Sequence, residues 1–247
     1  MERYTAMIAD VADSRRLDPE ARTDLQKQLY ESAETLNGLF GPALVKPVAF
    51  SAGDEIQGLF RSPEAAILCW RLLVLTLDGA ALRAGFGVGG WEVRIREAGT
   101  TAQDGTAYHR AREAIEAAEK YGETALLRSG DDPTDAAVNA LLGAALRICA
   151  GRRGSRAKQE AARTLELSCP LQFGGVPAGR DGVPIPNGAD GFFVRSGIAR
   201  GMPIRVAELL KVSPQSARGT LKAAGVYEER NLIIAALGLL HDRRERT

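Results

Sequence analysis

The sequence has no long apolar run, few cysteines and no paired-cysteine motif, and each absence argues against a class of protein. No apolar stretch reaches the roughly 18 residues that a membrane-spanning helix requires. The first residues lack the layout of a signal peptide. Cys69, Cys149 and Cys169 are odd in number and have no CxxC spacing, so we expect reduced thiols in a cytoplasmic protein rather than disulfides or a zinc site.

Charge is distributed unevenly along the chain. The 247 residues are enough for one large domain or two modest ones. Residues 1–150 carry 16 Lys and Arg against 22 Asp and Glu, whereas residues 151–247 carry 16 against 9. An acidic front half and a basic back half predict two domains with different partners, and the basic half is the candidate for nucleic-acid binding.

Hydrophobic periodicity predicts an α+β domain at residues 1–130 and a helical domain at residues 131–247. Strands are expected at 3–10, 43–51, 55–60, 81–93 and 123–130, and helices at 19–38, 63–77 and 105–122. This β-α-β-β-α-β-α-β order is that of a ferredoxin-like palm domain with an added helix and strand. In the helical domain, residues 168–200 are rich in Gly and Pro and are predicted to form a loop.

The turn in "FSAGDEIQGLF" (50–60) contains two adjacent carboxylates that a hairpin does not need. Gly53 supplies the residue that tolerates a positive φ, and Asp54 and Glu55 follow it. Asp10 ends the first strand, which lies beside the third strand in a ferredoxin-like sheet. Two carboxylates that close repel each other unless a cation such as Mg²⁺ or Mn²⁺ lies between them. Solvated turn residues are the alternative.

Glycines in "RAGFGVGG" (83–90) do not form a dinucleotide-binding fingerprint, because the strand pattern continues and no helix begins there. We expect them instead to allow close backbone packing. The apolar helix at 63–77 is more hydrophobic than one buried face requires, which predicts a homodimer.

Four segments carry a resemblance to a known family. "IADVADSRR", "FSAGDEIQGLF", "LRAGFGVGGWEV" and "DGTAYHRARE" occur in the order of the SatD family, and more remotely resemble class III nucleotide cyclases and GGDEF domains. The resemblance implies a nucleotide-cyclase-like palm that binds a nucleoside triphosphate or cyclic nucleotide with Mg or Mn. It implies that Asp10 and Asp54 are the catalytic residues and the metal ligands, with the Val11 carbonyl as a further ligand.

The same resemblance implies nucleotide contacts from Gly53 and Glu55. Arg15 in "DSRR" is a candidate triphosphate contact, with a solvated loop as the alternative, and Arg112 is a candidate that lies near the cyclase arginine position but out of register. The chain also departs from the cyclase pattern. It has Phe50 where adenylate cyclases place a purine-selecting Lys, and His109 and Glu113 where cyclases place Asn and a transition-state Arg. Two possibilities therefore stay open. The palm is a nucleotidyl cyclase that releases pyrophosphate, or it is a catalytically dead sensor or dimerisation platform in a DNA-binding regulator.

The segment at 203–225 predicts a helix-turn-helix, in which Ser213 caps the second helix and Pro214 occupies its first position. On that helix Ala217 and Leu221 are expected to pack inward. The outward residues, expected to contact duplex DNA, are Gln215, Ser216, Arg218 and Lys222. Further phosphate contacts are expected from Arg152, Arg153, Arg156 and Lys158. One alternative is that this segment is a protein-interaction module. Another is that the chain is a stress-associated interaction protein with neither nucleotide-cyclase nor DNA-binding activity.

Overall fold

The computed structural model describes residues 2–12, 14, 17–52, 54–77, 81–93, 95, 97–169, 171 and 202–246. The chain divides into two compact units, Met1–Asn139 and Ala140–Thr247. Each unit is described by itself. The predicted boundary after residue 130 falls just before the helix that leads from the first unit into the second. The predicted loop at 168–200 lies almost entirely outside the described residues.

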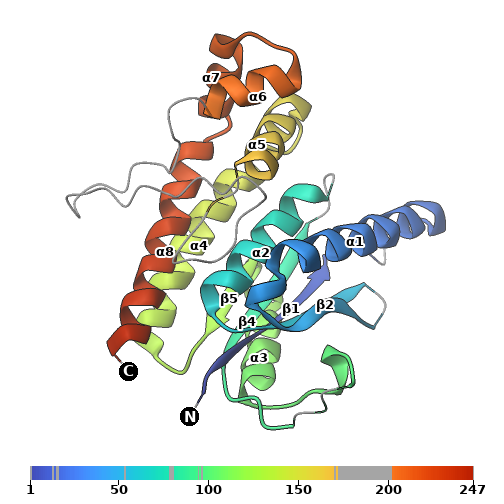
Figure 1. Ribbon diagram of the computed structural model, residues 1–247, viewed down its shortest axis with the longest axis vertical. Helices are drawn as coiled ribbons and strands as arrows, with labels where there is room; N and C mark the ends of the chain where they lie inside the picture. The colour runs from blue at the N-terminus through green and yellow to red at the C-terminus, as the bar shows by residue number, and fades with distance from the viewer. Residues whose placement is uncertain are drawn as a thin grey trace. The chain divides into compact units, whose positions relative to one another are not determined.

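The first unit is built on one five-stranded sheet (Figure 1). Its strands are β1 (Tyr4–Val11), β2 (Leu44–Ala52), β3 (Glu55–Phe60), β4 (Leu82–Gly89) and β5 (Ala125–Arg128), in the order β2-β3-β1-β4-β5. The first four strands pair antiparallel, whereas β5 runs parallel to β4. The predicted ferredoxin-like order with an added strand is therefore confirmed.

Helices cover both faces of this sheet, with α1 (Pro19–Phe40) and α2 (Pro63–Thr76) on one face and α3 (Thr106–Tyr121) on the other (Figure 1). The Asp18 carboxylate accepts a hydrogen bond from the Ala21 amide at 2.8 Å and so caps α1. Every residue of α2 from Pro63 to Leu73 is buried. Burial within the chain thus explains the high hydrophobicity of α2, which gives no support to a homodimer.

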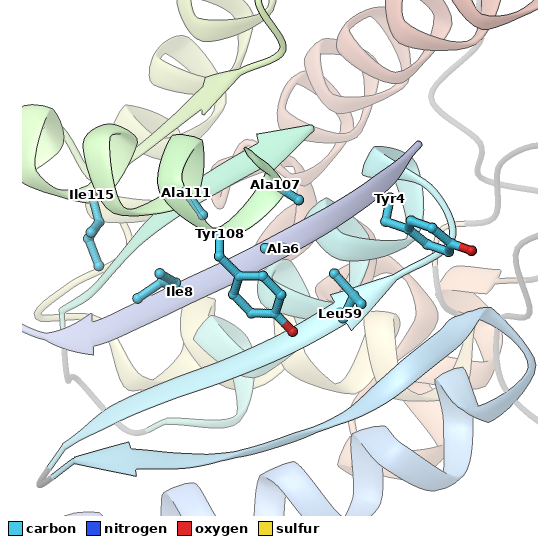
Figure 2. Packing of buried hydrophobic residues seen from close by; sticks show 8 residues of the cluster. All are labelled: Tyr4, Ala6, Ile8, Leu59, Ala107, Tyr108, Ala111 and Ile115. Carbon is cyan, nitrogen blue, oxygen red and sulfur yellow. The ribbon is translucent and has the colours of Figure 1, made fainter. Parts of the chain in front are cut away.

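Helix α3 lies unusually close to β4. Figure 2 shows Ala107, Tyr108, Ala111 and Ile115 of α3 packed over β1 and Leu59 of β3. A methyl group at Gly85 would overlap the carbonyl oxygen of Ala111, and one at Gly87 would overlap that of Ala107. These glycines let the helix backbone rest on the strand backbone, which confirms the close packing expected of them.

Strand β4 ends earlier than the sequence predicts, at Gly89 rather than at residue 93. The chain beyond it curls around two buried polar side chains. Lys46 Nζ and Gln103 Nε2 both donate to the Ile95 carbonyl oxygen, at 3.0 and 2.7 Å. The ladder itself stops at Gly89 because this residue pairs with Tyr4, the first residue of β1.

The second unit is helical. Its helices are α4 (Asp132–Ala150), which begins in the first unit, α5 (Arg156–Ser168), α6 (Met202–Leu210), α7 (Pro214–Ala223) and α8 (Val226–Arg246). Adjacent residues of α8 form buried ion pairs with α5 and with the turn before it, Arg230 with Glu166 and Glu229 with Arg152. Among the helices described, none is both long and apolar enough to span a membrane.

Candidate functional site

Carboxylates from β1 and from the β2–β3 turn gather at one end of the sheet. Asp10 lies directly opposite Arg83 of β4 in the β1–β4 register. On the other side, Ala9 pairs with Ile56, so one further step along the ladder brings Asp10 beside Glu55. Asp54 precedes Glu55 in the turn. The strand order therefore places Asp10, Asp54 and Glu55 at the same end of the sheet.

The surroundings of Asp10 perturb its carboxyl group. Burial raises its pKa, Arg83 opposes that shift, and the negative charges of Asp54, Glu119 and Glu55 add to it. Its Oδ1 is buried and accepts no hydrogen bond from any residue that the structure describes. Its Oδ2 lies 3.6 Å from the Arg83 guanidinium, beyond hydrogen-bond range. Among the described residues, the ionised carboxylate thus has no hydrogen bond that compensates for the burial of Oδ1.

Glu55, in contrast, is tightly held. Arg112 of α3 donates two hydrogen bonds to its carboxylate, at 2.6 and 2.9 Å, and Gln57 donates a third at 2.8 Å. The bond to Glu55 raises the pKa of Arg112, partly offset by burial, and the charges of Glu55, Glu116 and Asp10 raise it further. The Arg112 side chain remains 44% exposed. Arg112 is therefore fixed beside Glu55 while keeping an accessible edge.

Arg83 joins Asp10 to α3 on the opposite side. Its guanidinium lies 3.1 Å from Glu119 Oε1, closer than to Asp10, and its side chain is 17% exposed. Sequence reasoning missed Arg83, Glu119 and Gln57. The signal for Arg83 was available in the register, because an antiparallel neighbour of the first strand must place one residue opposite Asp10.

The structure brings Asp10, Val11, Asp54, Glu55 and Arg112 together at this end, as the predicted site requires. The other two predicted nucleotide contacts, Gly53 and Arg15, lie outside the described residues, as do Asp13 and Arg16. In the part of the chain that is described, no group of three or more His, Cys, Asp or Glu side chains is arranged to hold a metal ion.

Two polar residues near the start of α3 lie elsewhere. Arg110 points toward the opposite end of the sheet, where it donates to the carbonyl oxygens of Val88 and Ser129 at 2.6 and 2.9 Å. His109 is exposed and lies 3.2 Å from Asp104. Neither side chain reaches the carboxylates around Asp10.

The second unit exposes the helix face that the sequence singles out. The Ser213 hydroxyl accepts from the Ser216 amide at 3.1 Å and caps α7, while Lys211 adopts a positive φ of 55° in the turn after α6. Ala217 and Leu221 are buried, as predicted. The residues predicted to face outward are all exposed, namely Gln215, Ser216, Arg218 and Lys222.

The basic run after α4 is only partly on the surface. Arg153 and Arg156 are exposed and Lys158 is half-buried. Arg152 is buried, donates to the Ala224 carbonyl oxygen at 2.8 Å and pairs with Glu229. The expectation that Arg152 contacts phosphate is therefore wrong, since its guanidinium already satisfies the end of α7.

A sheet of this order with a partly buried aspartate cluster at one end defines an α+β domain of the palm type. Sequence comparison narrows the class, because the profile of the SatD family matches residues 4–162. The chain belongs to the SatD family. Comparison with the curated proteins finds no match.

Solved structures similar to this chain include nucleotide cyclase domains, which match about half of it. The catalytic core of a rhodopsin-guanylyl cyclase with converted specificity, in complex with ATPαS, is 13% identical, with a TM-score of 0.37 over 47% of this chain and 72% of that one. The guanylate cyclase domain of RhGC from Catenaria anguillulae, in complex with GTP, is 13% identical, with a TM-score of 0.36 over 47% of this chain and 72% of that one. An adenylate cyclase from Trypanosoma brucei in its monomeric state is 16% identical, with a TM-score of 0.34 over 45% of this chain and 68% of that one. The family assignment rests on the sequence profile alone.

Proposed function

We propose that the first unit binds a divalent cation, Mg²⁺ or Mn²⁺, together with a nucleoside triphosphate or cyclic nucleotide. The observation that supports this most strongly is the state of Asp10. A buried carboxylate oxygen without a hydrogen bond among the described residues, next to other carboxylates, is stabilised by a cation in its ionised form. Oxygen donors of this kind match the preference of Mg²⁺ and Mn²⁺.

In this proposal Asp10 and Asp54 hold the cation through their carboxylates, and Val11 contributes its backbone carbonyl. Two carboxylates are a sufficient protein ligand set for Mg²⁺ where substrate phosphates complete the coordination. A cation bound there would supply Lewis acidity for a nucleotidyl transfer. The same two aspartates are the residues that we propose as catalytic if turnover occurs.

Arg112 is the proposed phosphate contact on α3. Glu55 and Gln57 fix its position, and 44% of its side chain stays exposed at the end of the sheet that carries Asp10. A guanidinium held by a carboxylate on one edge can still donate from another edge to a phosphate oxygen. Gly53 and Arg15 remain proposed nucleotide contacts from the neighbouring loops.

We propose nucleotide recognition rather than efficient cyclase turnover. His109 and Glu113 stand where cyclases carry an asparagine and a transition-state arginine, and His109 lies with Asp104 while Glu113 lies 3.4 Å from Arg128. Neither side chain is directed at the cluster around Asp10. A sensor that binds nucleotide needs only the cation and the phosphate contacts, so it tolerates these replacements.

Thermal unfolding of the full chain, followed by tryptophan fluorescence, tests the proposal. Trp70 and Trp91 both lie in the first unit, so the signal reports this unit alone. At one hundred times Kd a ligand that binds only the native state adds about 2.7 kcal/mol. For a protein of this size that raises Tm by about 8 °C. We expect the rise with MnCl₂ plus a nucleoside triphosphate, and its loss in Asp10→Asn and Asp54→Asn.

Asp24→Asn is the matched control, because Asp24 is an exposed aspartate on α1. Its Tm rise should equal that of the wild type. A wild-type protein whose Tm does not respond to Mn²⁺ and triphosphates refutes the proposal. So does a response that persists unchanged in both Asp10→Asn and Asp54→Asn.

The exposed face of α7 supports a second proposed function, which is binding to duplex DNA. Gln215, Ser216, Arg218 and Lys222 face solvent from a capped helix that follows a tight turn. Side chains of these types contact base edges and phosphates in helix-turn-helix proteins. We propose that this face binds DNA and that the nucleotide site regulates it. In the alternative regulator the first unit would serve as a scaffold.

Salt-dependent binding to a fluorescent duplex tests the role of α7. The double variant Arg218→Glu/Lys222→Glu should weaken binding and flatten the slope of log affinity against log salt by roughly two units. Arg22→Glu/Lys27→Glu changes the net charge equally at exposed positions on α1 and should leave most of the affinity in place. Equal losses in the two double variants would show a non-specific effect of net charge and rule out α7 as the contact face.

A further inference from the structure

Arg83 has an unusual position between two carboxylates from different elements. It lies on β4 opposite Asp10 of β1, and its guanidinium approaches Glu119 of α3 at 3.1 Å but Asp10 only at 3.6 Å. The shorter distance permits a hydrogen bond and the longer one does not. Arg83 therefore forms its closer ion pair with Glu119 and a longer one with Asp10.

Asp10 consequently has a countercharge but no hydrogen-bond donor among the described residues. Its Oδ1 is without a partner and its Oδ2 is beyond the reach of Arg83. A guanidinium that donated directly to Asp10 would occupy the oxygen lone pairs that a cation needs. A countercharge held slightly away leaves these lone pairs open.

The backbone of Glu119 is held in place by the packing of α3, while its side chain is 68% exposed. Gly85 and Gly87 allow the backbone of α3 to touch the backbone of β4, the strand that carries Arg83. The distance between Glu119 and Arg83 is therefore set by two elements in direct contact. The other charged groups that face Asp10 are Asp54, Glu55 and Arg112, and Arg112 is already bound to Glu55.

We infer that Glu119 and Arg83 are a pair of positioning residues, in which Glu119 draws the Arg83 guanidinium away from Asp10 so that Asp10 can bind a cation. This inference rests on the proposed cation site. Residues that orient a metal ligand from behind commonly change metal affinity by roughly tenfold or more when they are replaced. The inference adds a specific requirement, that the effect of Glu119 is exerted through Arg83.

A double-mutant cycle separates this mechanism from simple attraction between Glu119 and the cation. Mn²⁺ binding to the full chain, without nucleotide, is measured by electron paramagnetic resonance of the free ion. Glu119→Gln should release Arg83 toward Asp10 and weaken Mn²⁺ binding roughly tenfold. In an Arg83→Met background the same substitution should have little effect, because no guanidinium remains to compete.

Glu113→Gln is the matched control. Glu113 is also an exposed glutamate of α3 paired with an arginine, at 3.4 Å from Arg128 of β5. It should change Mn²⁺ affinity by less than about twofold, the size expected for a screened surface charge.

The possible outcomes distinguish a failure of this inference from a failure of the proposed cation site. An equal loss from Glu119→Gln in the wild-type and Arg83→Met backgrounds would show that Glu119 acts by its own charge, and would overturn this inference alone. Wild-type protein that binds no Mn²⁺ under any of these conditions would overturn the cation site and the inference together. Loss only in the presence of Arg83 supports the inference.

Discussion

Replacing Gly87 by alanine tests how closely α3 lies on the sheet. A methyl group at this position would overlap the carbonyl oxygen of Ala107 and the amide nitrogen of Ala111. Both are backbone atoms of a helix, so no side chain can rotate to make room. The helix must move away from β4 instead, and this disturbs the packing of Tyr108 and Ile115 over β1 (Figure 2).

Overpacking of a well-packed interior costs about 1–3 kcal/mol, and contact with rigid backbone favours the upper end of that range. A loss of about 3 kcal/mol should lower Tm by about 9 °C in a protein of this size. Urea denaturation followed by tryptophan fluorescence measures the change in the first unit directly, because Trp70 and Trp91 lie there.

Gly38→Ala is the control for this experiment. Gly38 is an exposed helical glycine of α1, and a methyl group added there would meet no atom within 4 Å. Alanine has the higher helix propensity, so stability should rise by about 0.5–1 kcal/mol. An unchanged denaturation midpoint in Gly87→Ala would refute the close backbone contact, and with it the fixed position of Glu119.

The other predictions concern charge and assembly. Because burial raises the pKa of Asp10, its contribution to stability is fully present below the unfolded-state pKa near 4 and is lost as pH rises through the folded value. Asp10→Asn should therefore raise the urea midpoint of the metal-free protein at pH 7 and lose that advantage near pH 4. Glu229→Gln leaves the buried Arg152 charge without its counterion, and should cost about 3–5 kcal/mol by circular dichroism. Light scattering at micromolar concentration tests the homodimer, which a monomer throughout that range would rule out.

The strands and helices of the first unit were predictable because their sequence signals are local. Asp18 and Ser62 cap helices within a few residues of themselves, Gly122 ends α3 with a φ of 71°, and apolar residues repeat with the right period. The end of β4 was not predictable in this way. It depends on where β1 begins, since Gly89 pairs with Tyr4, and Lys46, which is remote in sequence, then holds the following loop through the Ile95 carbonyl group.

The residues of the candidate site likewise fall into those that local sequence predicts and those that it does not. Asp10, Asp54 and Glu55 were found because strand ends and turns can be read from the sequence. Arg83 and Glu119 act through distances between elements, which depend on how closely α3 approaches β4. Arg152 shows the opposite error, since a basic run in the sequence does not reveal which of its members is drawn into the interior by a buried glutamate.

The buried ion pairs of the second unit bear on how that unit meets a charged partner at long range. Arg152 and Arg230 are enclosed, but each is enclosed with a glutamate, Glu229 and Glu166. The interior thus removes equal amounts of the two signs, and the excess of 16 basic over 9 acidic residues in 151–247 is undiminished. At moderate salt a polyanion experiences this excess as an attractive field only within about 10 Å of the surface, the screening length, and the field reaches farther at lower salt. Encounter rates with polyanions should accordingly fall as salt is added, whichever residues make the final contacts.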